Sequence, residues 1–204
     1  MKNIFARRGS IEDLDDSALV ALAKEDRGAF GELYSRYLKK IYSYVYHRTG
    51  NTHDAEDLTA KVFMRAYSHI GNYEDRGLPF QAWLYRIAHN IVANWHRDQG
   101  RRKIIALDDY VAHSLKSEAP DSQAEESEER AQLMQAVRRL PEDRQQLLLL
   151  KFIEGMSNAE IGAIMGRTEG AIKSLYHRTL LALRDDLQQM SEPAPERRLG
   201  GTEV

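Results

Sequence analysis

Residues 157–184, SNAEIGAIMGRTEGAIKSLYHRTLLALR, predict two helices joined by a tight turn, and they decide the fold of the second half of the chain. Ser157 and Glu160 have capping-box spacing, so each side chain can bond a backbone N–H at the start of the first helix. Gly166 can adopt the positive φ that a turn of this kind needs. Thr168 can cap the second helix.

The second of these predicted helices has two chemically different faces. Residues at helical spacing form the inward face, namely Ile172, Tyr176, Thr179 and Leu183. The other face carries hydrogen-bond donors, namely Lys173, Ser174, His177 and Arg178. A helix that packs on one side and carries donors on the other is typical of the recognition helix of a helix-turn-helix, which meets phosphates and base edges. An amphipathic hairpin with a solvated basic face is the alternative interpretation.

Composition narrows the class of protein. The chain has 204 residues, room for one or two domains, and 42% hydrophobic residues, enough to build cores. It has no cysteine, and therefore neither a disulfide framework nor a thiolate metal site. The N-terminus lacks the apolar run of a secretory signal, and no stretch approaches the ~20 apolar residues of a membrane span. We expect a soluble, cytoplasmic protein.

The net charge of −2 is unevenly distributed along the chain. Between Asp108 and Arg130 eight acidic residues accompany two basic ones, whereas residues 81–103 and the recognition helix lean basic. Periodicity also fades over residues 104–127, which predicts a flexible, self-repelling acidic linker. A near-neutral sum therefore does not argue against a nucleic-acid partner.

Three helices are expected before the loop at residues 72–79. Asp16 or Ser17 should cap the first; a long apolar stripe with several tyrosines follows and ends at Gly50, and the tyrosines are expected in the core rather than stacked on bases. Asn51 or Thr52 should cap the next helix, whose acidic first turn suits the helix dipole. His53 and Asp57 have the spacing of a metal pair, but no matching ligand set accompanies them, so we predict no metal.

The helix that follows the loop at residues 72–79 mixes an apolar face with aromatic, amide and cationic side chains. Cations beside aromatic platforms are what a groove for single-stranded nucleic acid uses. A buried tryptophan followed by a basic helix C-terminus explains the same pattern. The local sequence leaves both interpretations open.

Four segments, in this order, resemble blocks of the small two-domain extracytoplasmic-function (ECF) sigma factors of the sigma-70 family. They are DAEDLTAKVF (54–63), FQAWLYRIAHNIVANWHR (80–97), LPEDRQQLLLLKF (140–152) and SNAEIGAIMG…GAIKSLYHR (157–178). The resemblance covers roughly residues 29–97 and 129–187. It implies an all-α chain with a region 2-like domain (17–103), the linker (104–127), a region 4-like helix-turn-helix domain (128–190) and a disordered tail (191–204).

The resemblance also implies a role for each domain. The first domain would bind the β′ clamp helices of core RNA polymerase through Asp54, Glu56, Asp57, Leu58, Lys61 and Phe63. It would melt the −10 promoter element and hold its single strand through Asn72, Tyr73, Arg76, Trp83, Arg86, His89, Asn90, Trp95 and Arg97. The second domain would read the −35 element as duplex through Arg167, Thr168, Lys173, Ser174, His177 and Arg178. The β flap and an anti-sigma factor are further expected partners, and no cofactor or catalytic residue is expected.

The chain departs from the family pattern in three ways. Ala60-Lys61 replaces a frequent Gln-Glu on the clamp-binding helix, and Leu175-Tyr176 replaces an arginine and an apolar residue, so Leu175 could touch a thymine methyl. No additional C-terminal sensor domain is apparent.

Two other classes of protein remain as alternatives. An autonomous helix-turn-helix regulator would bind duplex DNA alone, usually as a dimer on a palindrome. A metal-dependent hydrolase would draw on His53, Asp54, Asp57, His89 or His96, but the sequence offers no nucleophile–base pair or complete ligand set.

Overall fold

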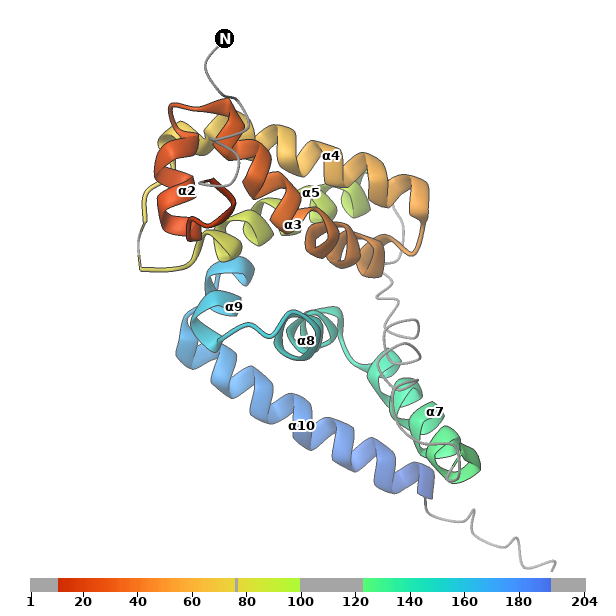
Figure 1. Cartoon of the computed structure of the whole chain (residues 1–204). Coiled ribbons are helices and arrows are strands. Elements are labelled where there is room, and N and C mark those ends of the chain that lie inside the picture. Colours follow the sequence, from red (N-terminus) through yellow and green to blue (C-terminus); the bar gives the residue numbers. More distant parts are fainter. Residues whose placement is uncertain (1–10, 76, 100–122, 192–204) are drawn as a thin grey trace, which may run out of the picture.

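The computed structural model describes residues 11–75, 77–99 and 123–191, which are helical apart from turns and loops (Figure 1). The first domain contains α2 (Asp16–Ala23), α3 (Arg27–Thr49), α4 (Thr52–His69), the 3₁₀ turn η1 (Ile70–Asn72) and α5 (Phe80–Gln99). The second contains α7 (Gln123–Arg139), α8 (Glu142–Leu148), the π-helical turn η2 (Leu149–Ile153), α9 (Asn158–Met165) and α10 (Glu169–Ser191). The all-α prediction is confirmed for these residues. Helix α7 begins inside the stretch predicted as linker, whose residues 104–122 lie outside the described ranges, as do residues 192–204 of the predicted tail.

The core of the first domain is the apolar stripe of α3 packed against α4 and α5. Tyr37 and Tyr44 are buried in it, as expected for core tyrosines, whereas Tyr34 is 41% exposed. Gly50 ends α3 in the left-handed conformation at φ 64°, and Asn51 caps α4 by accepting from the N–H of Asp54. Both predicted helix boundaries are confirmed.

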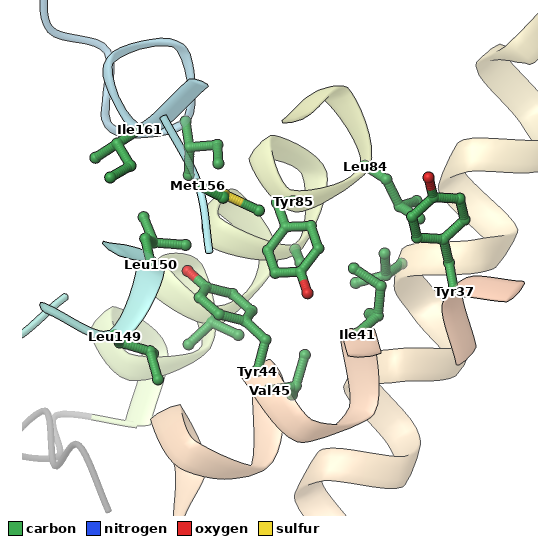
Figure 2. Close-up of a cluster of buried hydrophobic side chains, with 14 of the residues drawn as sticks. Tyr37, Ile41, Tyr44, Val45, Leu84, Tyr85, Leu149, Leu150, Met156 and Ile161 are labelled. Atoms are coloured by element: carbon green, nitrogen blue, oxygen red, sulfur yellow. The ribbon is translucent and has the colours of Figure 1, made fainter. Parts of the chain in front are cut away.

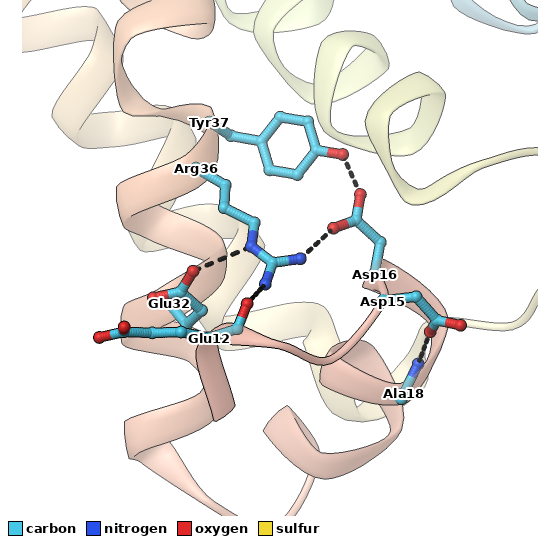
Figure 3. Close-up of polar contacts among 7 residues, drawn as sticks. All are labelled: Glu12, Asp15, Asp16, Ala18, Glu32, Arg36 and Tyr37. Atoms are coloured by element: carbon cyan, nitrogen blue, oxygen red, sulfur yellow. Dashed lines mark hydrogen bonds and ion pairs between the residues drawn. The ribbon is translucent and has the colours of Figure 1, made fainter. Parts of the chain in front are cut away.

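The cap of α2 differs from the prediction, for a tertiary reason visible in Figure 3. Asp15 caps the helix, accepting from the N–H of Ala18 at 2.8 Å. Asp16 instead pairs with Arg36 of α3 at 3.1 Å and accepts a hydrogen bond from the hydroxyl of Tyr37. Because its carboxylate binds side chains of α3, Asp16 holds α2 against α3 and does not cap α2.

The helix-turn-helix has the local structure that its sequence predicts. Ser157 and Glu160 form a reciprocal capping box, and Gly166 adopts a φ of 67° after α9. Thr168 accepts from the N–H of Ala171 at 3.2 Å at the start of α10. Gly162 is required for another reason: a Cβ there would lie 2.7 Å from the carbonyl oxygen of Arg167. The turn between α9 and α10 therefore closes directly over a glycine.

The two domains pack against each other, and their buried residues form one continuous apolar core. Helix α9 lies against α5 (Figure 1). Figure 2 shows Leu150 and Met156 of the second domain directed toward Tyr44 and Tyr85 of the first. All four side chains are almost fully buried. The described structure is thus a closed arrangement of the two domains.

Candidate nucleic-acid and polymerase interfaces

The predicted recognition helix α10 presents its donor face to solvent. Its exposed members are Lys173, Ser174, His177 and Arg178. Lys173 pairs with Glu169 at 2.8 Å, and the Nε of Arg178 donates to the carbonyl of Ser174 at 3.3 Å. Both contacts join residues of the same helix, so neither of them ties this face to another element of the protein. Arg167 and Thr168 are exposed at the preceding turn, where Arg167 pairs with Asp143 at 3.0 Å.

On the opposite, packed face of α10, one residue is buried that the sequence had predicted to be available for DNA contact. Ile172, Thr179 and Leu183 are buried as predicted, and Tyr176 is half-buried beside the ring of Phe152. Leu175, expected as a possible contact for a thymine methyl, is only 3% exposed. It lies on the packed side because that face is one residue wider than the predicted stripe. The exposed face of α10 around Leu175 is therefore formed by polar side chains.

The loop before α5 borders an open cavity of about 420 Å³. Its lining comes from α2 and the loop and includes Asp15, Asp16, Lys24, Tyr73, Asp75 and Phe80. Asn72 is exposed, whereas Tyr73 is 9% exposed and makes edge contacts with Phe80 and Trp83 at ring separations of 5.8 and 5.2 Å. Arg76, also predicted to bind the −10 strand, lies outside the described residues.

Helix α5 carries the remaining residues predicted to hold a single strand. Arg86, Asn90 and Arg97 are exposed, while Trp83, His89 and Trp95 are half-buried. Arg97 lies 3.6 Å from Asp98, and the ring of Trp95 packs edge-on against His96 at 4.7 Å. The tryptophans are therefore neither fully buried nor free platforms.

A buried polar cluster between α3, α5 and the second domain was not predicted. Arg48, 1% exposed, donates to Glu142 at 2.9 Å and to Gln146 at 3.2 Å. The side-chain amide of Gln146 also lies 2.6 Å from Nδ1 of His89. No local pattern could reveal this cluster, because its partners are 57 to 98 positions apart in the sequence.

Glu154 adds a second polar contact across the same interface. It accepts a hydrogen bond from the hydroxyl of Tyr85, and its other carboxylate oxygen is buried without a hydrogen-bond partner among the described residues. Burial raises the pKa of Glu154 to about 7, which the bond from Tyr85 and the charge of Lys40 partly oppose. The carboxyl group is therefore partly protonated near neutral pH.

Helix α4 presents a polar stripe whose members were only partly predicted. Glu56, Asp57 and Lys61 are exposed, and Asp54 is half-buried. Leu58 and Phe63, predicted to contact polymerase, are 3% and 5% exposed because they pack into the first domain's core, so they support this face rather than form it. Sequence reasoning missed Met64, 70% exposed, although it lies three residues after Lys61 on the same side of the helix.

The described residues form neither a metal-binding cluster nor a membrane span. No group of three or more His, Cys, Asp or Glu side chains gathers there in a way that could hold a metal ion. His53 and Asp57 are exposed and 4.0 Å apart. None of the described helices is long and apolar enough to span a membrane.

Family comparisons agree with this two-domain geometry. Residues 33–102 match the Sigma-70 region 2 family and residues 130–183 match the Sigma-70, region 4 family. Among similar proteins, the ECF RNA polymerase sigma factor BldN of Streptomyces coelicolor is 35% identical over 84% of this chain and 66% of its own length. SigW of Bacillus subtilis is 31% identical over 82% of this chain and 93% of its own length. The chain belongs to the ECF sigma factors of the sigma-70 family.

Members of this family are non-catalytic subunits of RNA polymerase, so the enzyme alternative is removed. The chain spans slightly less than two thirds of BldN and 63% of the ECF sigma factor SigE of Mycolicibacterium smegmatis, to which it is 34% identical.

Two solved structures share the fold. CnrH, in a complex with the cytosolic domain of CnrY, superposes with a TM-score of 0.58 at 21% identity, covering 87% of this chain and 99% of that one. RpoE of Bartonella quintana, in complex with the anti-sigma factor NepR, superposes with a TM-score of 0.56 at 22% identity. The match covers 80% of this chain and 98% of that one.

Proposed function

We propose that this chain directs promoter-specific transcription initiation by binding core RNA polymerase, reading a −35 element as duplex and melting a −10 element. The observation that carries the proposal is the helix-turn-helix, whose second helix, α10, is capped by Thr168 and exposes four polar side chains on one face. A helix of this shape fits the major groove, where cationic and hydroxyl donors meet base edges and phosphates. The proposed base-reading residues are Lys173, Ser174, His177 and Arg178. Arg167 and Thr168 would lie near the DNA backbone.

The first domain would hold the melted strand. The cavity beside Tyr73 has the volume of a small-molecule site, which suits a single unstacked base. Arg86, Asn90 and Arg97 on the exposed side of α5 would follow the strand's phosphates, and the half-buried Trp83, His89 and Trp95 would stack on or bond to its bases. Asn72 and Arg76 belong to the same proposed surface.

The polar stripe of α4 is the proposed docking face for the β′ clamp helices. Glu56, Asp57 and Lys61 are its exposed charges, with Asp54 at its edge. Met64 supplies an exposed apolar centre of the kind that interfaces favour. Lys61 places a cation beside these carboxylates, and this cation would change the strength of their electrostatic attraction for a basic partner.

Further partners are proposed by analogy with relatives. RpoE of Bartonella quintana was solved with the anti-sigma factor NepR, and CnrH with the cytosolic domain of CnrY. We therefore propose an anti-sigma factor for this chain, together with the β flap as the second domain's site on polymerase. A cytoplasmic location follows from these roles.

A pull-down with purified core polymerase, followed by run-off transcription from a promoter library, tests the proposal. A stoichiometric complex that initiates on promoters sharing a −35/−10 pair is the expected result. Tight duplex binding by the protein alone, without polymerase binding, would instead indicate an autonomous regulator.

A further inference from the structure

The methionine side chains of the described residues differ sharply in exposure. Met134 and Met156 are 8% and 3% exposed, and Met165 and Met190 are half-buried. Met64 is 70% exposed, the largest exposed fraction among the large apolar side chains of the described residues. The chain has no cysteine that could react in its place. Within the part of the chain that the structure describes, the thioether of Met64 is therefore the sulfur most accessible to a dissolved reagent.

The position of Met64 on α4 explains its exposure. The buried side of this helix, which includes Val62 and Phe63, packs against α3 and α5. Met64 lies on the outer side, and its neighbours one helical turn away, Lys61 and Tyr67, are also exposed. Figure 1 shows α4 along the edge of the first domain that faces away from the second domain. The packing of the described helices thus leaves this side chain open to solvent.

An exposed thioether reacts with hydroperoxides. The sulfur attacks one oxygen of hydrogen peroxide, so that an S–O bond forms while the O–O bond breaks. The proton on the transferred oxygen passes through solvent to the departing hydroxide, and the products are methionine sulfoxide and water. Sulfur loses two electrons and the peroxide gains them. The reaction converts an apolar side chain into a polar one, and methionine sulfoxide reductases reverse it.

We infer that Met64 is an oxidation site at which hydroperoxides weaken the docking of this chain on RNA polymerase. The inference rests on the function proposed above, which places the β′ clamp helices on α4. Met64 supplies the apolar part of a stripe that also carries the charges of Asp57 and Lys61. A sulfoxide would bring a polar oxygen into that apolar contact, and burying a polar group without a partner is unfavourable. Docking would also cover the thioether, so the free chain is the form that oxidises.

The first measurement identifies the residue that is oxidised. The full chain is treated with hydrogen peroxide, and the added oxygen is located by peptide mass spectrometry. We expect Met64 to react roughly tenfold faster than Met134 or Met156, because susceptibility to oxidation follows exposure. The difference should disappear in denaturant, where every methionine is accessible. Adding core polymerase before the peroxide should slow the oxidation of Met64.

The second measurement follows the affinity for core polymerase after catalase has removed the peroxide. Oxidation of the wild-type chain should lower this affinity by about tenfold, a typical loss for one central interface contact, and methionine sulfoxide reductases should restore it. Met64→Leu keeps an apolar side chain without sulfur, so its affinity should be the same before and after peroxide. Met165→Leu removes a half-buried sulfur instead and should respond to peroxide as the wild type does. Met64→Gln should bind weakly without any treatment.

Three results would overturn the inference. Faster oxidation of another described methionine would show that exposure of Met64 does not make it the reactive site. Unchanged core affinity after complete oxidation of Met64 would show that the sulfoxide does not disturb docking. An equal loss of affinity in Met64→Leu would assign the effect to another residue. Failure of the untreated chain to bind core would instead overturn the proposed function and the link to docking with it, whereas the site of oxidation is read without polymerase.

Discussion

The two surfaces that we propose to bind DNA are presented in opposite ways. On α10, the four proposed −35 readers are all exposed, and their ion pairs and hydrogen bonds stay within one helix. On α5, Trp83, His89 and Trp95 are half-buried, and His89 is engaged by Gln146 of the other domain. Duplex DNA can be read from outside, whereas a single strand exists only after melting. The difference teaches that the proposed duplex surface is complete within one helix, whereas the proposed single-strand surface is in contact with both domains.

The largest expected effect separates polymerase docking from both DNA surfaces. Asp57→Arg should lower core polymerase affinity by about a hundredfold or more, because it places a cation where a basic partner is proposed to dock. Asp185→Arg makes the same charge change on an exposed position of α10 and should leave core affinity unchanged. Titration of labelled core polymerase measures both. Wild-type affinity in Asp57→Arg would mean that the docking face lies elsewhere.

The next effect concerns the stability of the second domain alone. Gly162→Ala should destabilise it by ~2 kcal/mol, since the new Cβ would lie 2.7 Å from the carbonyl oxygen of Arg167. Gly31→Ala, in α3 with open space around the new methyl, should instead stabilise the first domain by ~0.5–1 kcal/mol. Thermal unfolding of both variants checks the contrast. Equal Tm values would show that α9 and α10 can separate without cost.

A smaller effect tests the exposed face of α10. Arg178→Ala should reduce transcription from −35-dependent promoters by about tenfold while leaving core binding intact, as loss of one DNA-contacting arginine typically does. Arg184→Ala removes another exposed arginine from the same helix, one that pairs with its neighbour Asp185. Run-off transcription should distinguish the two variants. A loss of polymerase binding in Arg178→Ala would contradict the separation of roles.

The smallest effect is a pH dependence of the contact between the domains. Burial raises the pKa of Glu154 from 4.5 to about 7, with Tyr85, Tyr44 and Lys40 facing the carboxyl group. The closed form binds a proton that the open form releases, so closure is favoured below pH 7 and weakens severalfold as pH rises through 7. Energy transfer between dyes attached at Thr52→Cys and Gln189→Cys, exposed positions of the two domains in a chain without cysteine, measures this from pH 6 to 8.

Glu154→Gln is the control for that titration. It keeps a hydrogen-bonding side chain at Tyr85 but cannot ionise, so energy transfer should become independent of pH over the same range. A pH response that survives the substitution would assign the titration to another group.

Local sequence signals predicted the helix-turn-helix well. The capping box at Ser157 and the turn at Gly166 depend on residues within four positions of each other, so the sequence alone shows them. The burial of Leu175 was missed because adjacent residues on a helix lie 100° apart, and the pattern did not show which bordered the core.

Contacts between distant segments explain the other differences. Asp16 failed to cap α2 because Arg36, twenty positions later, binds its carboxylate. The pairing of Arg48 with Glu142 joins residues 94 positions apart, and each of them looks locally like an ordinary helix-terminal charge. Such pairings follow from how the helices are placed in space, which the periodicity of one chain does not specify.

The apolar contact at Leu150 and Met156 also bears on how the chain acquires its structure during synthesis. The first domain leaves the ribosome complete before these residues are made, and domains generally fold in that order. Tyr44 and Tyr85 would then already be in place as a surface on which the nascent second domain can bury its side chains. The same contact that covers α5 would act as an internal folding template and shield newly made apolar residues from aggregation.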